Sequence, residues 1–378
     1  MKVAILIGHY YPYIGGAEIF AQRLAEYLVR RGNKVDVITG WWDKELARSE
    51  VISGVNVHRI RILRIRHLAQ MTLFFPMFLK LFTLDRQARY DVFHTVGETV
   101  IAYAGATMKV LRKKPHIITI QGTTLVTGLG NGLVGFILRK LSRLSLKQAS
   151  LVHTISRELA SIAERYGAKN VMVVPNGVDM AEFIPMGKEK ARKKLDIPPD
   201  ESIVVCVARL VPVKGIDYLI RAIALLSQLN NRISLLVIGD GPQRSDLEKL
   251  ALELGLRDKV KFLGALPHEQ IPLYLNAADI FVQPSLHEGL GIALIEAMAC
   301  GIPVVGTRVD GILDIIEDGE NGFLVPSRDS EAIAKAVKKI FADEDIRSRF
   351  IAKGLETVKD KFQWDDVLPK IEEVYHSL

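Results

Sequence analysis

The sequence predicts an α/β protein of two domains, each a doubly wound parallel sheet with helices on its faces. Three observations carry this prediction. Short apolar runs of strand-like composition alternate with helical segments along the chain, which is typical of βαβ units. The chain has 378 residues, a length that favours two domains over one continuous core. Hydrophobic residues make up 49% of it and charged residues 25%, as in a globular protein.

The first half contains seven apolar runs that we predict as strands. They cover residues 2–8, 34–40, 55–60, 91–96, 116–122, 150–156 and 171–175. The segment 17–31 is predicted as a helix, because its apolar residues recur on one face and Gly32 ends it. Strands that alternate with helices in this way predict a parallel sheet.

The second half repeats this pattern. Its predicted strands cover residues 202–208, 234–241, 260–264, 279–284, 303–307 and 322–326. Between the halves, the stretch 183–202 is polar and rich in proline. We therefore predict that this stretch is the linker between the two domains.

Cysteine usage and the N-terminus bear on the compartment. The two cysteines, Cys206 and Cys300, lie in apolar segments and form neither a disulfide framework nor a metal-ligand pattern, which fits a reducing cytosol. The apolar start of the chain lacks a signal-peptide cleavage pattern. No run reaches the roughly 18 apolar residues of a spanning helix. We expect a cytoplasmic protein.

The charge is divided unevenly along the chain. Residues 1–190 hold 27 Lys and Arg against 14 Asp and Glu, and residues 191–378 hold 23 against 29. These balances of +13 and −6 give the net charge of +7. No acidic residue occurs between Glu98 and Glu158. The first half is therefore expected to meet an anionic partner, or at least to tolerate one.

The stretch 283–307 holds the strongest candidate for a site. An apolar strand ends there, and Gly289 and Gly291 permit a tight turn whose N–H groups are exposed at a helix start. The helix that follows is almost entirely apolar, yet Glu288 lies in the turn and Glu296 inside the helix. A carboxylate in such a setting is costly without a partner. This arrangement predicts a site for a phosphorylated ligand rich in hydroxyl groups.

This stretch resembles the signature of the retaining family-four glycosyltransferases. The resemblance lies in the two glutamates with seven residues between them, within S-x-x-E-G-L-G-x-x-x-x-E-A-M-A-x-G-x-P-V-V. It implies the GT-B fold, in which two Rossmann-like domains face each other across a cleft. The acceptor-side domain is then 1–182 and the nucleotide-sugar domain 183–361, with the terminal helix 362–378 packing back on the first. Without the resemblance, the two glutamates could be ordinary polar positions of a βαβ unit.

The resemblance also assigns roles within this stretch. It implies that Glu288 lies beside the transferred sugar and that Glu296 accepts hydrogen bonds from the ribose hydroxyls. The N–H groups of Gly289, Leu290 and Gly291 would then face the sugar or the diphosphate. Retention allows either a covalent intermediate or front-face attack assisted by the leaving phosphate. The family is usually described by the second route.

Two cations follow the first strand of the second half. Arg209 and Lys214 suit a diphosphate, because one offers a fork of donors and the other a compact charge. They resemble the family's phosphate-binding pair, which implies that they take the place of a metal ion in catalysis. We therefore expect no metal and no cofactor besides the donor substrate. The alternative is a pair of solvated loop cations.

Further candidate positions lie in loops and at strand ends. The resemblance implies that these glycines and Leu266 contact the donor: Gly15, Gly16, Gly239, Gly241. His94 and Gln121 are candidates on the acceptor or sugar side. Many family members carry histidine where this chain has Gln121, and glutamine does not titrate near neutral pH. For His94 the alternative is a strand-end histidine with structural partners, and for the glycines it is plain turn geometry.

Two segments join cations to dense apolar runs. The segment 58–82 carries Arg59, Arg61, Arg64 and Arg66, and the segment 133–147 has the same character. Basic amphipathic elements suit an anionic membrane surface, although each could equally pack a core with a solvated basic face. We predict peripheral membrane attachment and a lipid-linked or membrane-associated acceptor. A soluble acceptor is the alternative.

Other classes of protein are disfavoured. No G-x-G-x-x-G follows the first strand, as a dinucleotide dehydrogenase requires, and no phosphate-binding loop motif is present. Aromatic residues make up 7% of the chain and no nucleic-acid module occurs, so we expect no nucleic-acid partner. Two alternatives are a nucleotide-sugar 2-epimerase and a nucleotide-sugar-binding protein without catalysis.

Overall fold

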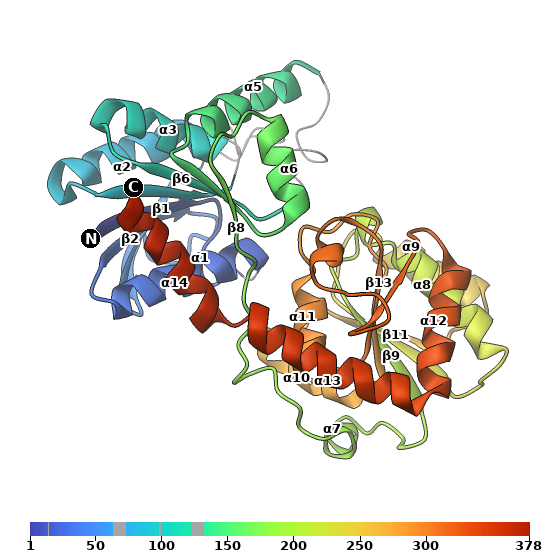
Figure 1. The fold of residues 1–378 in the computed structure, drawn as a ribbon. Helices are drawn as coiled ribbons and strands as arrows, with labels where there is room; N and C mark the ends of the chain where they lie inside the picture. Colours follow the sequence, from blue (N-terminus) through green and yellow to red (C-terminus); the bar gives the residue numbers. More distant parts are fainter. Residues whose placement is uncertain (14, 63–72, 98–99, 123–131) are drawn as a thin grey trace. The chain divides into compact units, whose positions relative to one another are not determined.

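The computed structural model describes residues 1–13, 15–62, 73–97, 100–122 and 132–378. The chain forms two compact units (Figure 1). Unit 1 comprises Met1–Asn176 with Asp365–Leu378, and unit 2 comprises Gly177–Trp364. The first boundary follows Asn176, a few residues before the predicted position after residue 182.

Unit 1 is built on an eight-stranded sheet of order β3-β4-β2-β1-β5-β6-β7-β8. The strands are β1 (Lys2–Ile7), β2 (Lys34–Gly40), β3 (Ser49–Ile52), β4 (Val55–Ile60), β5 (Val92–Val96), β6 (His116–Ile120), β7 (Leu151–Thr154) and β8 (Val171–Val173). Neighbouring strands pair in parallel except β3, which pairs antiparallel with β4 at the edge. The sequence prediction missed β3, because this edge strand is short and half exposed and lacks an apolar run.

Helices cover both faces of this sheet. They are α1 (Gly16–Arg30), α2 (Phe74–Ala88), α3 (Val100–Arg112), α5 (Gly132–Gln148), α6 (Arg157–Arg165) and α14 (Trp364–Ser377). In Figure 1, α2, α3 and α5 lie on one face of the sheet, and α1 and α14 lie on the other. The apolar face of α1 buries Phe20, Leu24 and Leu28 completely against the sheet. This two-sided cover is what continuous apolar strands require.

The terminal helix α14 is anchored in unit 1. Glu372 accepts hydrogen bonds from the Tyr27 hydroxyl at 2.8 Å and from Arg31 Nε at 3.3 Å. The Tyr375 hydroxyl lies against Nδ1 of His94 in the sheet interior. α14 therefore belongs to the core of unit 1, although it follows unit 2 in the chain.

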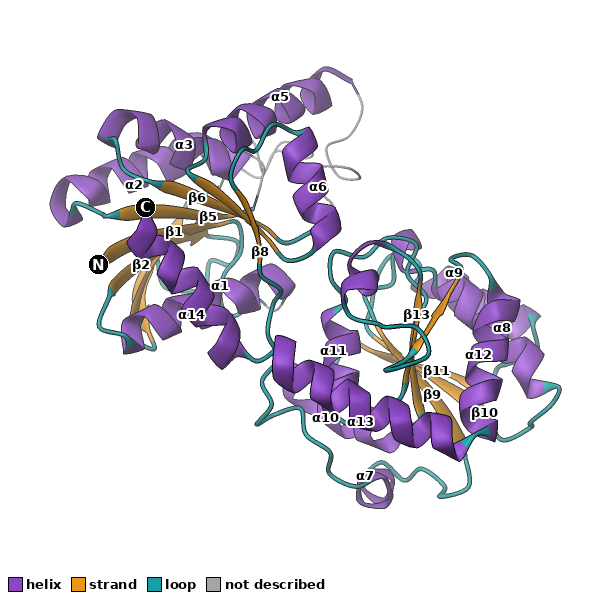
Figure 2. Cartoon of the chain, viewed as in Figure 1, coloured by secondary structure: helices purple, strands orange, loops and turns teal. Residues whose placement is uncertain are grey.

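Unit 2 is built on a fully parallel six-stranded sheet of order β11-β10-β9-β12-β13-β14. The strands are β9 (Ser202–Val207), β10 (Ile233–Ile238), β11 (Val260–Gly264), β12 (Ile280–Gln283), β13 (Val304–Thr307) and β14 (Phe323–Val325). Its α-helices are α7 (Lys188–Lys194), α8 (Ile216–Ser227), α9 (Arg244–Glu253), α10 (Ile271–Ala277), α11 (Ile292–Ala299), α12 (Ser330–Ala342) and α13 (Glu344–Lys361). The short 3-10 helices are η2 (Pro212–Lys214), η3 (His268–Gln270) and η4 (Asp310–Asp314). Figure 2 shows the helices packed around this sheet.

The predicted linker is an ordered part of unit 2. It contains α7, and Arg192 of that helix is almost completely buried. The Arg192 guanidinium donates to the Asp279 carboxylate at 2.8 Å and to the carbonyl oxygen of Ala277 at 3.0 Å. The polar composition of 183–202 thus reflects a segment held by buried hydrogen bonds, which composition alone did not reveal.

Candidate active site

The candidate site lies at the carboxyl edge of the unit 2 sheet. The strand order reverses between β9 and β12, because the chain builds β10 and β11 on one side of β9 and β12 to β14 on the other. In an open parallel sheet, ligands bind beside the carboxyl ends of strands at such a switch point. The loops after β9, β10, β11 and β12, together with the helix α11, carry the predicted donor residues of unit 2.

A glycine joins the loops after β9 and β12. Gly215 has a φ of +60°, and a Cβ there would lie 2.3 Å from the carbonyl oxygen of Pro284. The N–H of Leu286 donates to the carbonyl oxygen of Val213 at 2.8 Å. A side chain at residue 215 would separate the two loops. This close approach places Lys214 against the glycine turn, residues 284–291.

Lys214 and Glu288 form an ion pair in the glycine turn. Lys214 Nζ donates to both carboxylate oxygens of Glu288, at 2.9 and 2.7 Å. The same carboxylate accepts from Gln283 Nε2 and Ser285 Oγ, each at 2.9 Å. The Glu288 side chain is only 11% exposed, so these partners offset its desolvation.

Asp310 and Gly311 hold the other side of the glycine turn. The Asp310 carboxylate accepts from the N–H of Glu288 at 3.0 Å and pairs with His287 Nδ1 at 3.1 Å. The N–H of Gly311 donates to the carbonyl oxygen of Glu288 at 3.1 Å. A Cβ on Gly311 would lie 2.3 Å from the carbonyl oxygen of Gly289. The sequence analysis did not select Asp310, whose link to the turn depends on a contact between distant segments.

The N–H groups at the end of this turn are available to a ligand. Gly291 has a φ of +100° and is the N-cap of α11. The N–H groups of Gly289, Leu290 and Gly291 donate no hydrogen bond within the part of the chain that the structure describes. Donors at a helix start attract anions. The turn therefore presents free donors beside the Lys214–Glu288 pair.

Glu296 lies one turn into α11 and is buried. His268, in η3, places Nε2 at 2.8 Å from Glu296 Oε1. Its other ring nitrogen lies 3.7 Å from Glu182, and its ring packs 5.1 Å from that of Phe183. His268 therefore orients Glu296, and the sequence analysis missed it. A signal existed, because His268 follows the predicted donor residue Leu266 by two positions.

The predicted glycines after β10 are required by packing. Gly239 has a φ of +129°, and a Cβ there would lie 2.0 Å from the carbonyl oxygen of Ala208. A Cβ on Gly241 would lie 2.4 Å from the carbonyl oxygen of Leu210. The loops after β9 and β10 therefore touch on either side of Arg209.

The Arg209 side chain is exposed and makes no ion pair with a described residue.

The remaining candidate glycines begin α1 in unit 1. Gly15 is the N-cap of this helix and Gly16 its first residue. A Cβ on Gly15 would lie 2.4 Å from Glu18 Oε2, so this carboxylate curls back over the helix start. Burial raises the pKa of Glu18 above its usual value. A carboxylate near a helix N-terminus is favourable to the helix dipole.

The two acceptor-side candidates have structural partners. His94 is completely buried, with Nε2 at 2.6 Å from Thr119 Oγ1 and Nδ1 against the Tyr375 hydroxyl. Gln121 exchanges two hydrogen bonds with Asn176, at 2.7 and 3.1 Å. For His94 this geometry favours the structural alternative, because both ring nitrogens are occupied inside the core.

The structure thus places Arg209, Lys214 and Glu288 in the loops of unit 2 and Glu296 in the helix α11. Gly15, Gly16, His94 and Gln121 belong to unit 1. Among the described residues, no group of three or more His, Cys, Asp or Glu side chains is placed to hold a metal ion.

The fold and this site define a glycosyltransferase of the GT-B class. Residues 14–182 match the model of Glycosyltransferase Family 4, and residues 187–357 match that of Glycosyl transferases group 1. The chain therefore belongs to this family of retaining glycosyltransferases, as the resemblance in the sequence implied.

Individual relatives agree with this assignment. An uncharacterized glycosyltransferase of Methanocaldococcus jannaschii is 34% identical, over 99% of this chain and 98% of that protein. The structure of sucrose-phosphate synthase from Thermosynechococcus elongatus superposes with a TM-score of 0.88 at 26% identity, covering 100% of this chain and 98% of the other. HepE of Anabaena, solved in complex with UDP, has a TM-score of 0.83 at 23% identity, with both chains fully covered. The HepE likeness shows the shared fold.

Proposed function

We propose that unit 2 binds a nucleoside-diphosphate sugar and that the protein transfers the sugar, with retention, to an acceptor hydroxyl. One observation carries this proposal: the Lys214–Glu288 pair lies beside three free N–H donors on the turn that starts the helix of Glu296. The cation can bind a diphosphate, and the free N–H groups can donate to a phosphate or a sugar. The buried carboxylate can accept hydrogen bonds from ribose hydroxyls.

In the proposed reaction, Lys214 and Arg209 stabilise the charge that develops on the departing diphosphate. Fixed cations aimed at developing charge lower the barrier without reorganisation, and they do so without a metal ion. Glu288 lies beside the sugar, where a carboxylate stabilises positive charge at the anomeric carbon. Glu296, oriented by His268, accepts from the ribose hydroxyls. The leaving phosphate accepts the acceptor's proton in front-face attack.

Acceptor-dependent release of nucleoside diphosphate tests this function. UDP-, GDP- and ADP-linked sugars are first ranked by the rise they cause in melting temperature, since a ligand that binds the native state stabilises it. UDP sugars are tested first, because the structure of HepE was solved in complex with UDP. Release of diphosphate that requires an acceptor supports transfer. Donor binding without release under any acceptor would identify a binding protein instead.

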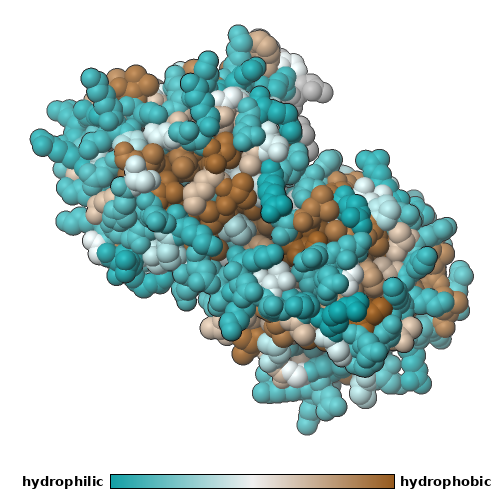
Figure 3. All heavy atoms as spheres, viewed as in Figure 1, coloured by the Kyte–Doolittle hydropathy of each residue, from teal (hydrophilic) through white to brown (hydrophobic). Residues whose placement is uncertain are grey.

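We further propose that unit 1 holds a lipid-linked or membrane-associated acceptor at an anionic surface. The support is the +13 balance of residues 1–190 and a set of exposed apolar side chains on neighbouring helices. These are Phe75 and Leu79 of α2, Val110 and Leu111 of α3, and Phe136 of α5. Figure 3 shows apolar side chains among the hydrophilic ones of unit 1. None of the helices in the described ranges is long and apolar enough to cross a bilayer.

The structure does not leave all four arginines of the segment 58–82 available to this surface. Arg59 is buried and forms an ion pair with Glu50, so it is not available to a membrane. Met77, an apolar residue of the segment 58–82, is buried in the core. Arg64 and Arg66 lie outside the described residues. Of the four arginines, Arg61 is both described by the structure and exposed.

Co-sedimentation with vesicles separates the membrane acceptor from a soluble one. Each cation near an anionic leaflet contributes about 1 kcal/mol, so attachment should be reversible and weakened by salt. We expect binding to anionic but not neutral vesicles, reduced by Arg→Glu changes at 61, 64 and 66. Absence of binding, with full activity on a water-soluble acceptor, would favour the alternative.

A further inference from the structure

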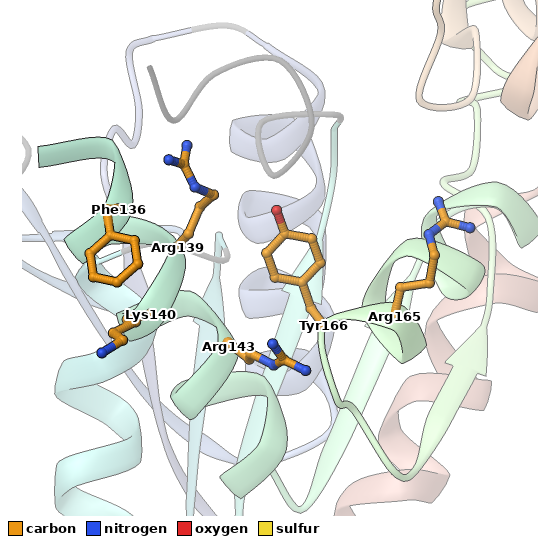
Figure 4. Close-up of a pocket in the computed structure, with 6 residues that line it drawn as sticks. All are labelled: Phe136, Arg139, Lys140, Arg143, Arg165 and Tyr166. Atoms are coloured by element: carbon orange, nitrogen blue, oxygen red, sulfur yellow. The ribbon is translucent and has the colours of Figure 1, made fainter. Parts of the chain in front are cut away.

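A basic cavity opens on unit 1 beside α5 and the end of α6. Its volume is about 330 Å³, and its lining is Phe136, Arg139, Lys140, Arg143, Arg165 and Tyr166. Figure 4 shows the Tyr166 ring standing between the cations of α5 and the side chain of Arg165. Four of the six lining residues are cations, so the cavity gathers positive charge around a small space.

The cations of α5 are not balanced within their own helix. Every charged residue of Gly132–Gln148 is Lys or Arg, and Arg143 has Arg139 and Lys147 four residues away on either side. Like charges at this spacing destabilise a helix. A bound anion would remove this repulsion.

The described neighbours of Arg143 and Arg165 supply little negative charge to balance these two guanidinium groups. Arg143 makes no ion pair with any described residue, and Lys140 lies 4.9 Å from the centre of the Phe136 ring. Arg165 pairs with Glu158 at 3.3 Å, but both side chains are largely exposed. Exposed pairs of this kind are weak and exchange readily. The guanidinium groups of Arg143 and Arg165 can therefore turn to a ligand.

We propose that this cavity binds a phosphate group carried by an organic molecule. Guanidinium groups match phosphate oxygens with paired hydrogen bonds, and a tyrosine hydroxyl can add another. The volume exceeds that of a bare ion and is at the lower end of the range for small-molecule sites. Phe136 and Tyr166 offer apolar surface to the part of the ligand next to its phosphate.

The phosphate has two sources, an anionic lipid headgroup or a soluble phosphate ester. The proposal goes beyond the transfer reaction, because the cavity lies in unit 1 and uses none of the proposed donor residues of unit 2. It also holds whether or not the acceptor is a lipid.

Calorimetric titration of the full-length protein with glycerol 3-phosphate is the first test. Arg143→Glu should weaken binding at least tenfold, and Arg143→Gln, which removes the charge but keeps a similar helix propensity, should weaken it less. Arg30→Glu is the matched control, since Arg30 is exposed on α1 of the same unit. Lys214→Ala should leave this binding intact, which separates it from phosphate bound at the donor site. Melting curves verify that each variant is folded.

Vesicles of phosphatidylglycerol and of phosphatidylcholine then identify the source. If Arg143→Glu lowers binding to phosphatidylglycerol more than Arg30→Glu does, the ligand is a lipid headgroup. If the variants differ only with glycerol 3-phosphate, it is a soluble ester. Equal losses for Arg143→Glu and Arg30→Glu with both probes, or no binding of either probe by the wild type, would overturn the proposal. Donor-dependent turnover, measured in parallel, reports separately on the transfer reaction.

Discussion

The two units share an architecture of parallel strands and covering helices, but they place their polar groups differently. Unit 2 fills most of its strands with apolar residues and sets charged groups beyond the strand ends, where Lys214 pairs with Glu288 and His268 with Glu296. Unit 1 buries polar groups inside its sheet and leaves cations on its helices. Under the two proposals above, the same architecture serves two kinds of recognition, a preformed small-molecule site in unit 2 and a charged surface in unit 1.

The buried polar groups of unit 1 form a hydrogen-bonded chain. Thr119 lies between His94 and His153, at 2.6 and 2.9 Å, and His153 Nε2 contacts the carbonyl oxygen of Val174 at 2.7 Å. His116 pairs with the Thr95 hydroxyl at 2.9 Å. The described histidines that are fully buried all belong to this unit. Burial favours the neutral form of these imidazoles, and Nδ1 of His116 has no hydrogen-bond partner among the described residues.

This difference should make unit 1 the acid-sensitive part of the molecule. Burial lowers the pKa of His116 to about 3 and that of His153 to about 4, from 6.5. Below pH 6.5 the histidines of the unfolded chain take up protons, whereas the buried histidines of the native sheet do not. Their contribution to the free energy of unfolding is therefore fully present above pH 6.5 and is lost as the pH falls toward 4 and 3. Together the two histidines should cost roughly 4 kcal/mol at pH 5. Urea unfolding at pH 8 and pH 5, read by hydrogen exchange in each unit, measures this loss.

The histidines can be separated from general acid effects. His116→Gln cannot take up a proton, so it should flatten the pH dependence of unit 1 by about a third, because burial also lowers the pKa of His94 and His153. The variant also loses packing. Equal pH dependence of both units would remove this distinction between them.

Glu288→Gln should have the largest effect on catalysis. Removing the charge from the glycine turn leaves Lys214 without its counterion and the developing positive charge on the sugar without a carboxylate. We expect kcat to fall about 100- to 1000-fold, as when a group that stabilises the transition state is lost. Steady-state kinetics measure it, with Glu253→Gln on the exposed face of α9 as the control. A change confined to KM would assign Glu288 to binding alone.

Glu296→Gln should act mainly on donor affinity. Its carboxylate, fixed by His268, is proposed to face the ribose, a part of the donor that does not react. We expect a rise in KM of roughly tenfold with kcat near the wild-type value, since such a contact is made equally in the ground and transition states. His268→Gln should show the same pattern more weakly. The reverse ranking of Glu288 and Glu296 would contradict their roles.

Most of the fold was predictable from local patterns. Long apolar strands such as 34–40 and 55–60 agree with β2 and β4 at both ends, because their periodicity and their flanking turns coincide. The edge strand β3 and the helix α7 were not predicted. The strand β3 is short, half exposed and paired with the adjacent β4, so it lacks an apolar run. The helix α7 depends on a contact with the distant residue Asp279, which no local pattern contains.

The site was predictable only in part, for the same reason. The residues around Glu288 and Glu296 form a continuous motif, so their resemblance to a family was visible. Asp310 and His268 reach these glutamates from the short helices η4 and η3, and only the folded unit brings them together. Arg59 shows the opposite error. The sequence analysis selected it as one of a row of surface cations, but the structure buries it in an ion pair with Glu50.

Removal of divalent metal should have the smallest effect. The proposed stabilisation of the diphosphate comes from Arg209 and Lys214, so a chelator should leave kcat unchanged. Turnover with and without EDTA tests this. Activity lost with the chelator and restored by magnesium or manganese would show that the two cations are insufficient.

The central claim is that the cations of unit 2 hold the donor diphosphate, and titration of nucleoside diphosphate into Arg209→Ala tests it most directly. Arg209 is exposed and makes no ion pair with a described residue, so its removal should leave the free protein undisturbed. The account predicts affinity lower by roughly 10- to 150-fold, the loss of a charged hydrogen bond worth about 1.5–3 kcal/mol. The control Arg221→Ala, exposed in the middle of α8, should bind as the wild type does. Unchanged affinity in Arg209→Ala would contradict the account.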